Sequence, residues 1–492
     1  MSFPPLPVAV PGDAAERLLG TRVDVADAVI ERLRSVCATV DTDAESCAEG
    51  ARDWWPLGLL WARGGEVPRR PSVVARPDSV VEVAAILEVC FRERVPVTPF
   101  AGRSGVCGGS VPKLGGVSLD LAGLSGIVEV CDHDLTARVA AGMNGLRFET
   151  ALRDEHYLSA GHWPQSIALA SVGGWVACRG AGQYSTRYGK VEDMVVGLEV
   201  VRADGTVLRT GGRAPREAAG PDLSQLFVGS EGTLGVITEV QLRVHELPRA
   251  AGKLAYAFPT FLEGLEACRR ILRRGATPAV LRLYDTHESQ RYDGDGRSVL
   301  LVLDEAEPGL LDATLKIVGE ECRVAEALDP VLVDAWLSHR NDVSQLGTAL
   351  EHGYVVDTYE IAGRWSALPT IYEQVCSAAR KVSGLQLISA HQSHAYPDGA
   401  CLYFTFAGVP DGDPDSFYLA ASDAITKTTL AAGGALSHHH GIGLNRARHL
   451  EQSLGAPAFA SLTAIKQALD PAGILNPGGL GLPSALGVVS WP

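Results

Sequence analysis

The ten cysteines of this chain include no C-x-x-C spacing, so the sequence has no zinc-ribbon pattern. Scattered cysteines of this kind favour reduced thiols in a cytosol-like compartment. The first residues lack the basic start and apolar run of a secretory leader, and no apolar stretch reaches the roughly 18 residues of a membrane span. We therefore expect a cytoplasmic protein without an integral membrane segment, for which peripheral contact with a membrane stays open.

Basic residues are the minority among the charged side chains, and this limits the partners of the protein. The formal net charge is −15, which disfavours a general nucleic-acid binder. An anionic substrate would therefore need cations placed locally at its site. With 492 residues the chain has room for about three domains, and it contains no internal repeat.

Two common nucleotide-binding signatures are also absent. The chain contains neither G-x-G-x-x-G nor the Walker pattern, which argues against a nicotinamide Rossmann domain and against a P-loop. Glycine itself is plentiful, with 54 residues. It gathers in three segments, at 100–109, 161–175 and 229–238.

The first glycine segment follows a predicted β-α-β unit. The pattern predicts a strand at 73–75, a helix over 80–93 that begins after Asp78 or Ser79, and a strand at 95–99. Glycines let successive backbone N–H groups converge on an anion such as a pyrophosphate. The same loop could equally be a structural turn.

Three consecutive histidines, His438, His439 and His440, run into Gly441-Ile442-Gly443. Each buried imidazole needs a polar partner, so such a run usually marks chemistry or a metal site. If segment 436–440 is extended, His438 and His440 share one face and His439 points the other way. We therefore do not expect all three rings to act together.

These motifs together resemble the vanillyl-alcohol-oxidase family of flavoproteins, whose FAD-binding fold is also called the para-cresol-methylhydroxylase (PCMH) type. The resemblance extends from about residue 70 to residue 480. It rests on the helix start at 76–79, the three glycine segments, Gly189 to Asp193, and Asp470 to Gly478.

The resemblance implies an α+β fold: a PCMH-type FAD-binding fold of two subdomains, an α/β substrate-capping domain and a C-terminal helical segment. We expect an N-terminal helical arm at 1–66 with Trp54 and Trp55 docked onto the body. The FAD-binding domain would span 67–247 and the cap 248–425. Residues 426–492 would return to close the flavin site. The family is commonly homodimeric, so a homodimer is expected.

The cofactor implied is FAD, held without a covalent bond. No histidine lies in the first loop, and Cys107 and Cys178 occupy positions of ordinary small residues. The residues expected to contact FAD are Phe100, Ala101, Gly102, Arg103, Ser104, Gly105, Val106, Gln165, Ser166, Ser171, Gly174, Cys178, Glu231, Gly235 and Ile237.

Within this superfamily the chain is most similar to the alkylglycerone-phosphate (alkyldihydroxyacetone-phosphate) synthases, through residues 281–285, 399–404 and 437–443. These enzymes exchange an acyl group for a fatty alcohol, with flavin N5 acting on a carbon next to a carbonyl. The resemblance makes Tyr403 the acid/base group and gives catalytic roles to His439, His440 and His162. It makes Arg282, Arg340 and His438 substrate-binding residues for an anionic, small or lipid-like substrate.

Each of these assignments has an ordinary structural alternative. Tyr403 lies in a strand-like run and could be a core residue, Arg282 could form a structural ion pair, and Arg340 could lie on a solvated helix. A free phenol titrates near pH 10, so Tyr403 acts as a base only if cationic neighbours lower its pKa, and we expect the adjacent histidines to supply that charge.

The 2-hydroxy-acid dehydrogenases of the same superfamily carry E-H-G-I-G at the histidine run, so His439 stands where they have a metal-ligating glutamate. Their H-x-G-D-G-N-x-H motif is also broken here, after His391 and His394. We therefore expect no metal site, while metal binding by His391 and His394 stays open.

Three functions remain compatible with the sequence. The first is a synthase-like transferase that uses FAD. The second is an FAD-linked oxidase or dehydrogenase of a 2-hydroxy acid or a specialised metabolite, because the stretch after Asp285 is shorter than in the synthases. The third is a non-catalytic protein stabilised by FAD.

Overall fold

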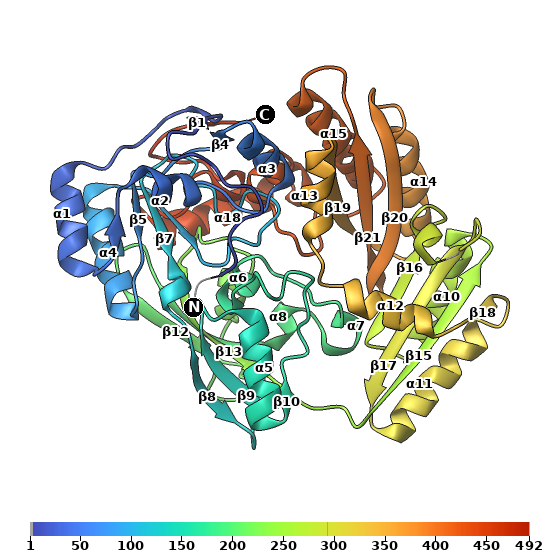
Figure 1. The fold of residues 1–492 in the computed structure, drawn as a ribbon. Helices are drawn as coiled ribbons and strands as arrows, with labels where there is room; N and C mark the ends of the chain where they lie inside the picture. The colour runs from blue at the N-terminus through green and yellow to red at the C-terminus, as the bar shows by residue number, and fades with distance from the viewer. Residues whose placement is uncertain (1–2, 293, 492) are drawn as a thin grey trace.

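Sheets of four, five and seven strands define the architecture of the computed structural model, which describes residues 3–292 and 294–491 (Figure 1). The two smaller sheets come from the first half of the chain, and the seven-stranded sheet comes from residues 250–408. None of the helices in the described ranges is long and apolar enough to cross a membrane.

The four-stranded sheet has the order β3-β5-β7-β6, with β5, β7 and β6 parallel. Its strands are β3 (Val40–Asp41), β5 (Val73–Ala75), β7 (Val117–Asp120) and β6 (Val97–Phe100). The strand predicted at 73–75 and the helix predicted over 80–93 are confirmed, while the strand predicted at 95–99 runs from Val97 to Phe100. Ser79 is the N-cap of α4 (Val80–Glu93), because its side chain accepts a hydrogen bond from the Glu82 N–H.

The five-stranded antiparallel sheet has the order β12-β11-β13-β9-β8. Its strands are β12 (Val207–Gly211), β11 (Val195–Val201), β13 (Val236–Arg243), β9 (Thr136–Ala140) and β8 (Ile127–Cys131). Val240 and Leu242 of β13 are buried and Arg243 is exposed, as the alternation in the sequence predicts. Helices α5 (Gly145–His156) and α6 (Val172–Ala177) complete this core.

The seven-stranded sheet is antiparallel throughout and has the order β18-β15-β17-β16-β20-β21-β19. Its strands are β18 (Glu326–Leu328), β15 (Ala250–Phe258), β17 (Ser298–Ala306), β16 (Val280–Tyr284), β20 (Leu385–Tyr396), β21 (Gly399–Gly408) and β19 (Val355–Arg364). One face packs against helices α10 (Phe261–Arg273), α11 (Pro308–Glu321), α14 (Leu368–Ala379) and α15 (Pro414–Ala431).

The opposite face of this sheet is turned toward the first half of the chain. Leu281 and Leu283 belong to the core under the helices, so the intervening Arg282 lies on the other face. Helix α12 (Val331–His339) packs on that face through Val333 and Trp336.

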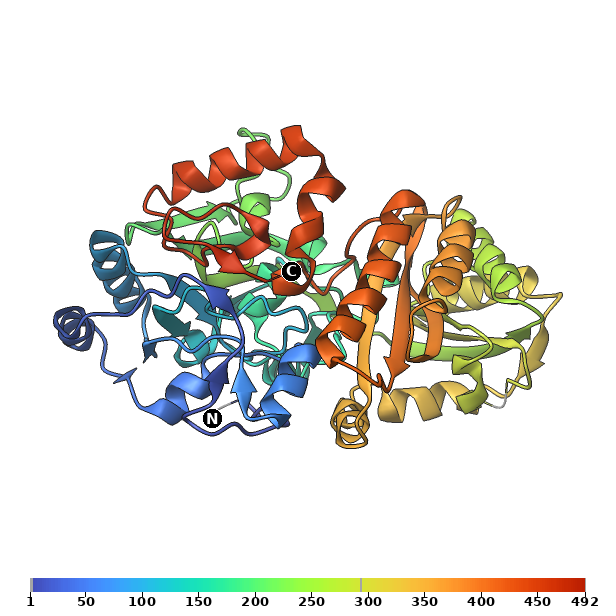
Figure 2. The ribbon, with the colours of Figure 1, turned by 90° about the horizontal axis from the view of Figure 1, so that it is seen from above.

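The last part of the chain returns to the first half, where α18 (Ala456–Leu469) lies (Figure 2). The Lys466 ammonium group donates hydrogen bonds of 2.7 Å to the carbonyl oxygens of Thr233 and Leu475. Leu475 also forms a β-bridge with Val97. These contacts tie the chain's end to the strand that leads into the first glycine loop.

The remaining elements are short. They are β1 (Ala15–Glu16), β2 (Leu19–Gly20), α1 (Asp27–Val36), α2 (Ala44–Glu49), α3 (Pro56–Arg63), β4 (Glu66–Val67), η1 (Leu121–Gly123), β10 (Leu158–Ser159), α7 (Ser185–Tyr188), α8 (Val191–Met194), α9 (Ser224–Phe227), β14 (His245–Glu246), η2 (Glu288–Tyr292), α13 (Ser344–Glu351), α16 (Gly443–Arg446), η3 (Ala447–His449), α17 (Leu450–Leu454), η4 (Gly479–Gly481) and β22 (Val489–Ser490).

An aromatic cluster joins the N-terminal segment to the second half of the chain. Trp55 is fully buried and makes edge-on contacts with Trp61, Trp491 and Tyr418 of α15. Its indole N–H donates a hydrogen bond of 2.9 Å to the Tyr418 hydroxyl. The prediction that Trp54 and Trp55 dock onto the body is confirmed.

We expect Trp55→Ala to lower the free energy of unfolding by about 3–5 kcal/mol, because it removes a buried indole that joins three segments. Val81→Ala is the control: Val81 is 73 % exposed on α4, and its truncation should change stability by less than about 0.5 kcal/mol. Urea denaturation followed by fluorescence and circular dichroism measures both. A loss as small as that of the control would show that the cluster does not hold these segments together.

Candidate active site

A cavity of about 350 Å³ lies between the first half of the chain and the face of the seven-stranded sheet that carries Arg282. All fifteen residues expected to contact FAD line it, from Phe100 in the first glycine loop to Ile237 in β13. Tyr403, His439, His440, His162 and Arg282 line it as well. Arg340 and His438 do not.

The first glycine loop is built to receive an anion. No backbone N–H from Gly102 to Val106 donates a hydrogen bond to another group of the described ranges. A Cβ at position 102 would lie 2.0 Å from the carbonyl oxygen of Leu169, so only glycine fits there. Gly102 is buried and the residues from Arg103 to Val106 are half-buried, so their N–H groups favour an acceptor, and the pyrophosphate of FAD supplies such oxygens.

His162 adds a second observation that fits a bound cofactor. Both of its ring nitrogens are buried without a hydrogen-bond partner in the described part of the chain, although the ring lines the cavity. Burial lowers the pKa of His162 to about 3, so the ring is neutral and can donate one hydrogen bond and accept another. We conclude that the residues present fit FAD.

The register of the seven-stranded sheet assembles the polar side of the cavity. Glu360 of β19 pairs with Tyr403 of β21, Tyr403 pairs with His391 of β20, and His391 pairs with Tyr284 of β16. Directly paired residues share a face, so these side chains form one row across four strands. The Tyr403 and His391 rings stack, with centroids 4.6 Å apart and 16° between planes.

Tyr403 and His439 meet inside the cavity. The Tyr403 hydroxyl lies 2.5 Å from Nε2 of His439, and the edge of His440 faces the phenol ring from a centroid distance of 5.5 Å. The structure therefore brings together the predicted acid/base tyrosine and two of the three histidines. Strand β21 positions the tyrosine and a separate loop positions the histidine, so only the tertiary fold brings the two side chains together.

The expectation that cationic histidines lower the pKa of Tyr403 is wrong. Burial raises the pKa of Tyr403 well above its usual value, even with Arg282 nearby. Burial also lowers the pKa of His440 to about 4, and burial with the neighbouring imidazoles keeps the pKa of His439 well below its usual value. The pair is therefore a neutral phenol and a neutral imidazole at pH 7.

A second polar group surrounds Arg282. Its guanidinium donates hydrogen bonds to the Tyr284 hydroxyl at 2.7 Å and to His391 Nε2 at 2.7 Å. Because arginine only donates, His391 Nε2 must accept, and its Nδ1–H donates to the Glu288 carboxylate at 3.0 Å. Both ring nitrogens of His391 are thus engaged by protein groups. His394 Nδ1 lies 2.8 Å from the Ser185 hydroxyl.

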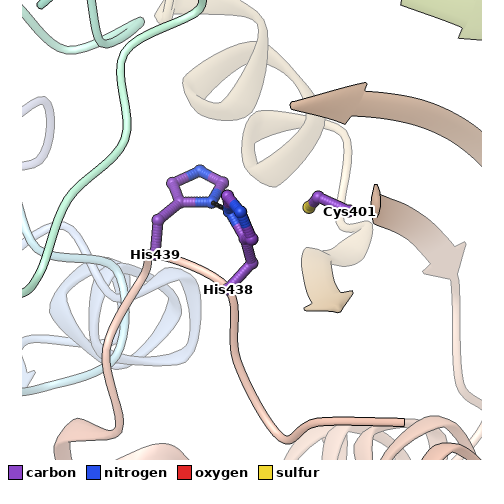
Figure 3. Close-up of side chains that lie close together, drawn as sticks. All are labelled: Cys401, His438 and His439. Carbon is purple, nitrogen blue, oxygen red and sulfur yellow. Dashed lines mark hydrogen bonds between the residues drawn. The ribbon is translucent and has the colours of Figure 1, made fainter. Parts of the chain in front are cut away.

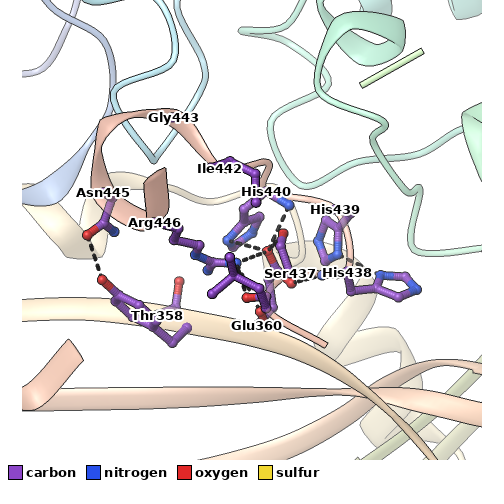
Figure 4. A network of polar contacts seen from close by, with 12 residues as sticks. Thr358, Glu360, Ser437, His438, His439, His440, Ile442, Gly443, Asn445 and Arg446 are labelled. Carbon is purple, nitrogen blue, oxygen red and sulfur yellow. Dashed lines mark hydrogen bonds and ion pairs between the residues drawn. The ribbon is translucent and has the colours of Figure 1, made fainter. Parts of the chain in front are cut away.

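A buried ion pair that the sequence did not single out holds the histidine run (Figure 4). The Glu360 carboxylate, which is fully buried, accepts hydrogen bonds from the Arg446 guanidinium, the Ser437 hydroxyl and the backbone N–H groups of His438 and His440. Burial alone would raise the pKa of Glu360, but Arg446, the histidines and these donors hold it at about 2. The carboxylate is therefore charged, and it fixes the backbone of the run.

A second carboxylate holds the glycines that follow. Glu231 accepts hydrogen bonds from the backbone N–H groups of Ile442 at 2.6 Å and Gly443 at 2.9 Å. Gly441 and Gly443 have positive φ angles of 84° and 53°, and a Cβ at Gly443 would lie 2.1 Å from the Cys107 carbonyl oxygen. Glycine is required at both positions, because the loop must approach the first half of the chain this closely.

Residues 438–440 form a bend rather than an extended segment, so the alternation expected for an extended chain does not apply to the three histidines. His439 and His440 therefore both line the cavity, whereas His438 lies beyond it. His438 and His439 touch through their Nδ1 atoms, 2.9 Å apart. The His438 ring also stacks on His394 and Tyr396.

The structure does not bring Arg340 into the cavity. Its guanidinium lies over the rings of Trp163 and Tyr184, 4.9 Å from each centroid, and 5.7 Å from that of Trp336. The carbonyl oxygen of Arg340 accepts a hydrogen bond from the Gln183 side chain at 3.1 Å. This arginine holds α12 against the first half of the chain through cation–π contacts.

One group in the described ranges has three candidate metal-ligating atoms within 4.8 Å of one another, and it consists of Cys401, His438 and His439 (Figure 3). The two imidazoles already bond each other, and His439 also bonds Tyr403. A metal ion would have to break these contacts, so we assign no metal to the group.

We expect Glu360→Gln to lower the free energy of unfolding by about 3–5 kcal/mol and to weaken FAD binding, because it leaves Arg446 buried without its counter-charge. Glu326→Gln is the matched control. Glu326 pairs with Arg297 at the surface, where its side chain is 61 % exposed, and the loss should stay below about 1 kcal/mol. Denaturation and FAD titration test both variants. Equal losses would show that the buried pair does not organise the site.

Comparisons with known proteins identify the family of this chain. Residues 71–211 match the family model "FAD binding domain", and residues 247–480 match "FAD linked oxidases, C-terminal domain". The chain is 31% identical over 433 residues to the uncharacterized FAD-linked oxidoreductase YgcU of Escherichia coli (strain K12), covering 83% of this chain and 88% of that protein. It is 28% identical over 461 residues to alkyldihydroxyacetonephosphate synthase of Dictyostelium discoideum, covering 85% and 74%.

Solved structures share the fold. A structure of alkyldihydroxyacetonephosphate synthase matches with a TM-score of 0.79 at 24% identity, over 97% of this chain and 89% of that one. Substrate-bound p-cresol methylhydroxylase matches with a TM-score of 0.76 at 18% identity, over 94% and 99%. With its PCMH-type fold and its anion-binding loop, the chain belongs to the FAD-linked oxidases of the vanillyl-alcohol-oxidase type, and its cofactor is FAD.

Proposed function

We propose that this flavoprotein takes a proton from a carbon that lies next to a carbonyl or hydroxyl group in an anionic substrate, and exchanges a group on that same carbon as the alkyldihydroxyacetonephosphate synthases do. The observation that carries this proposal is the 2.5 Å contact between the Tyr403 hydroxyl and His439 Nε2 in the FAD cavity. A phenol paired with an imidazole can give or take a proton without a metal ion.

FAD, when bound, supplies an electrophilic ring system that accepts an electron pair. The chain's own residues then have two tasks, to hold the substrate and to move its proton. The raised pKa of Tyr403 keeps its hydroxyl protonated at rest, so it can donate a hydrogen bond to a substrate oxygen or to His439. It becomes a base only while His439 takes its proton.

Arg282 is the residue best placed to hold an anionic group. Two arginines line the cavity, and Arg103 already pairs with the Glu49 carboxylate at 3.1 Å. Arg282 has no carboxylate within ion-pair distance in the described ranges; its partners are Tyr284, Ser393 and His391. A half-buried guanidinium whose direct partners are all neutral favours a carboxylate or phosphate from the substrate.

The second candidate is oxidation of a 2-hydroxy acid. The family model that matches residues 247–480 is that of the C-terminal domain of FAD-linked oxidases, and this match favours the second candidate. The same residues would serve, because Arg282 would bind the carboxylate and the Tyr403–His439 pair would take the hydroxyl proton. The two candidates differ in whether the flavin is oxidised or reduced once the substrate has reacted in the absence of an electron acceptor.

Anaerobic mixing separates the two candidates. Group exchange predicts that acyl-dihydroxyacetone phosphate releases fatty acid only when a fatty alcohol is present, while the flavin ends oxidised. Bleaching of the flavin's visible absorbance by a 2-hydroxy acid would favour the redox candidate instead.

With whichever substrate turns over, Tyr403→Phe should lower the turnover number by a factor of about 10² to 10⁴, because it removes the acid/base hydroxyl. Tyr256→Phe is the matched control, since Tyr256 lies in the core of the seven-stranded sheet and does not line the cavity. It should keep wild-type turnover. Full activity of Tyr403→Phe would remove the acid/base assignment.

A further inference from the structure

A second cavity, of about 330 Å³, lies behind the histidine run and reaches the surface. Its rim includes Arg364 and Asp398, whose side chains are 78 % and 74 % exposed and lie 3.6 Å apart. Tyr396 and His438 line its inner wall. The first cavity and this one are therefore separated by the imidazole rings of the run.

An unbroken series of short contacts crosses this wall. The Tyr403 hydroxyl lies 2.5 Å from His439 Nε2, and His439 Nδ1 lies 2.9 Å from His438 Nδ1. The remaining nitrogen of the series, His438 Nε2, has no hydrogen-bond partner in the described part of the chain. This nitrogen is buried, and it belongs to a residue that lines the second cavity.

We propose that Tyr403, His439 and His438 form a proton relay that connects the flavin cavity with the second cavity. The proposal rests on the acid/base role of Tyr403 proposed above, since that residue is the inner end. The relay gives His438, which does not reach the flavin cavity, a role in proton transfer. It also gives the proton a route out of the flavin cavity.

Hydrogen-bond rules fix how the relay works. In a contact between two imidazole Nδ1 atoms, one nitrogen carries the hydrogen and the other accepts it. When His439 carries it, His439 Nε2 accepts from the Tyr403 hydroxyl and His438 carries its hydrogen on Nε2. When His438 carries it, His439 Nε2 donates to the Tyr403 oxygen and His438 Nε2 is bare.

Outward transfer converts the first arrangement into the second. The Tyr403 O–H bond breaks and its proton joins His439 Nε2, while the Nδ1 proton of His439 passes to His438 Nδ1. The Nε2 proton of His438 passes to water in the second cavity. Tyr403 is left as a phenolate, both imidazoles stay neutral, and one proton has left. Inward transfer reverses each bond, so a cycle that removes and then returns a proton restores the start.

The surroundings keep the relay neutral. No carboxylate in the described ranges lies within 4 Å of a ring nitrogen of His438 or His439. Lys190, whose ammonium group donates to the His438 carbonyl oxygen at 2.6 Å, adds a positive charge nearby. Neither imidazole is therefore trapped as a cation, which would end the transfer.

A competing path exists and can be tested separately. His394 Nδ1 lies 2.8 Å from the Ser185 hydroxyl, which lies 3.2 Å from the hydroxyl of Tyr396 on the second cavity. This path does not include Tyr403. Tyr396→Phe cuts it and leaves the histidine run intact.

The test follows one proton in a single turnover that needs no substrate. Holoenzyme reduced to the anionic flavin hydroquinone is mixed anaerobically with ferricyanide. Each flavin gives two electrons to two ferricyanide ions, whose reduction consumes no proton, so each reoxidised flavin releases one proton. Flavin absorbance gives the oxidation rate, and phenol red in weak buffer gives proton release. The variants are His438→Ala, His438→Gln and Tyr396→Phe, and rates are compared per bound flavin.

In the wild type and in Tyr396→Phe, proton release should keep pace with flavin oxidation. In both His438 variants it should lag by at least about tenfold, and added imidazole should restore it in His438→Ala. The relay would be overturned if proton release kept pace with flavin oxidation in both His438 variants, or if proton release lagged behind flavin oxidation in Tyr396→Phe alone. If Tyr403→Phe keeps full substrate turnover while the His438 variants still lag, the proposed function fails and the path through His438 stands.

Discussion

The buried pair of Glu360 and Arg446 is the contact on which the rest of the site depends. Glu360 lies on β19, at the edge of the seven-stranded sheet, and Arg446 belongs to the segment that follows the histidine run. Their 2.9 Å contact and the hydrogen bonds from the run fix the histidines against the sheet that carries Tyr403. Glu231 holds the following glycines to the first half of the chain, so two carboxylates from different parts of the fold clamp one loop.

This arrangement explains how the site holds many polar side chains. Charged groups with a structural task are paired, as Glu360 is with Arg446 and Arg103 is with Glu49. The residues proposed to act on the substrate are different: Tyr403 and His439 are neutral, and Arg282 has only neutral partners. Neutral groups in a buried site can both donate and accept protons, and a guanidinium without a direct carboxylate partner attracts an anion.

Local features of the structure could be predicted from the sequence, while features that depend on strand register could not. Helix α4 and strand β5 follow from spacing and capping, and the glycine loops follow from the conformations that glycine permits. The row from Glu360 through Tyr403 to His391 depends on the register in which β21 pairs with both β19 and β20, and on β19 pairing across the intervening helix α14. Nothing in the sequence alone marked Glu360 as a residue of the site, because a single glutamate in a strand has many explanations.

The errors in the histidine run have the same physical origin. Alternation assumes an extended chain, but two carboxylates bend this segment and place His439 and His440 in one cavity. The cationic role assumed solvated imidazoles, but burial keeps them neutral. Sequence motifs identified the residues that meet in the site, and only the tertiary environment decides their protonation.

Neutron diffraction from the oxidised holoenzyme tests the central claim, a neutral chain of Tyr403, His439 and His438, most directly, because it locates the hydrogen atoms. The account predicts a protonated Tyr403 oxygen, a single hydrogen on His439 at Nδ1, where it points to His438 Nδ1, and a single hydrogen on His438 at Nε2. A doubly protonated His439, a Tyr403 phenolate at rest, or a metal ion bound between Cys401 and the two histidines would contradict it.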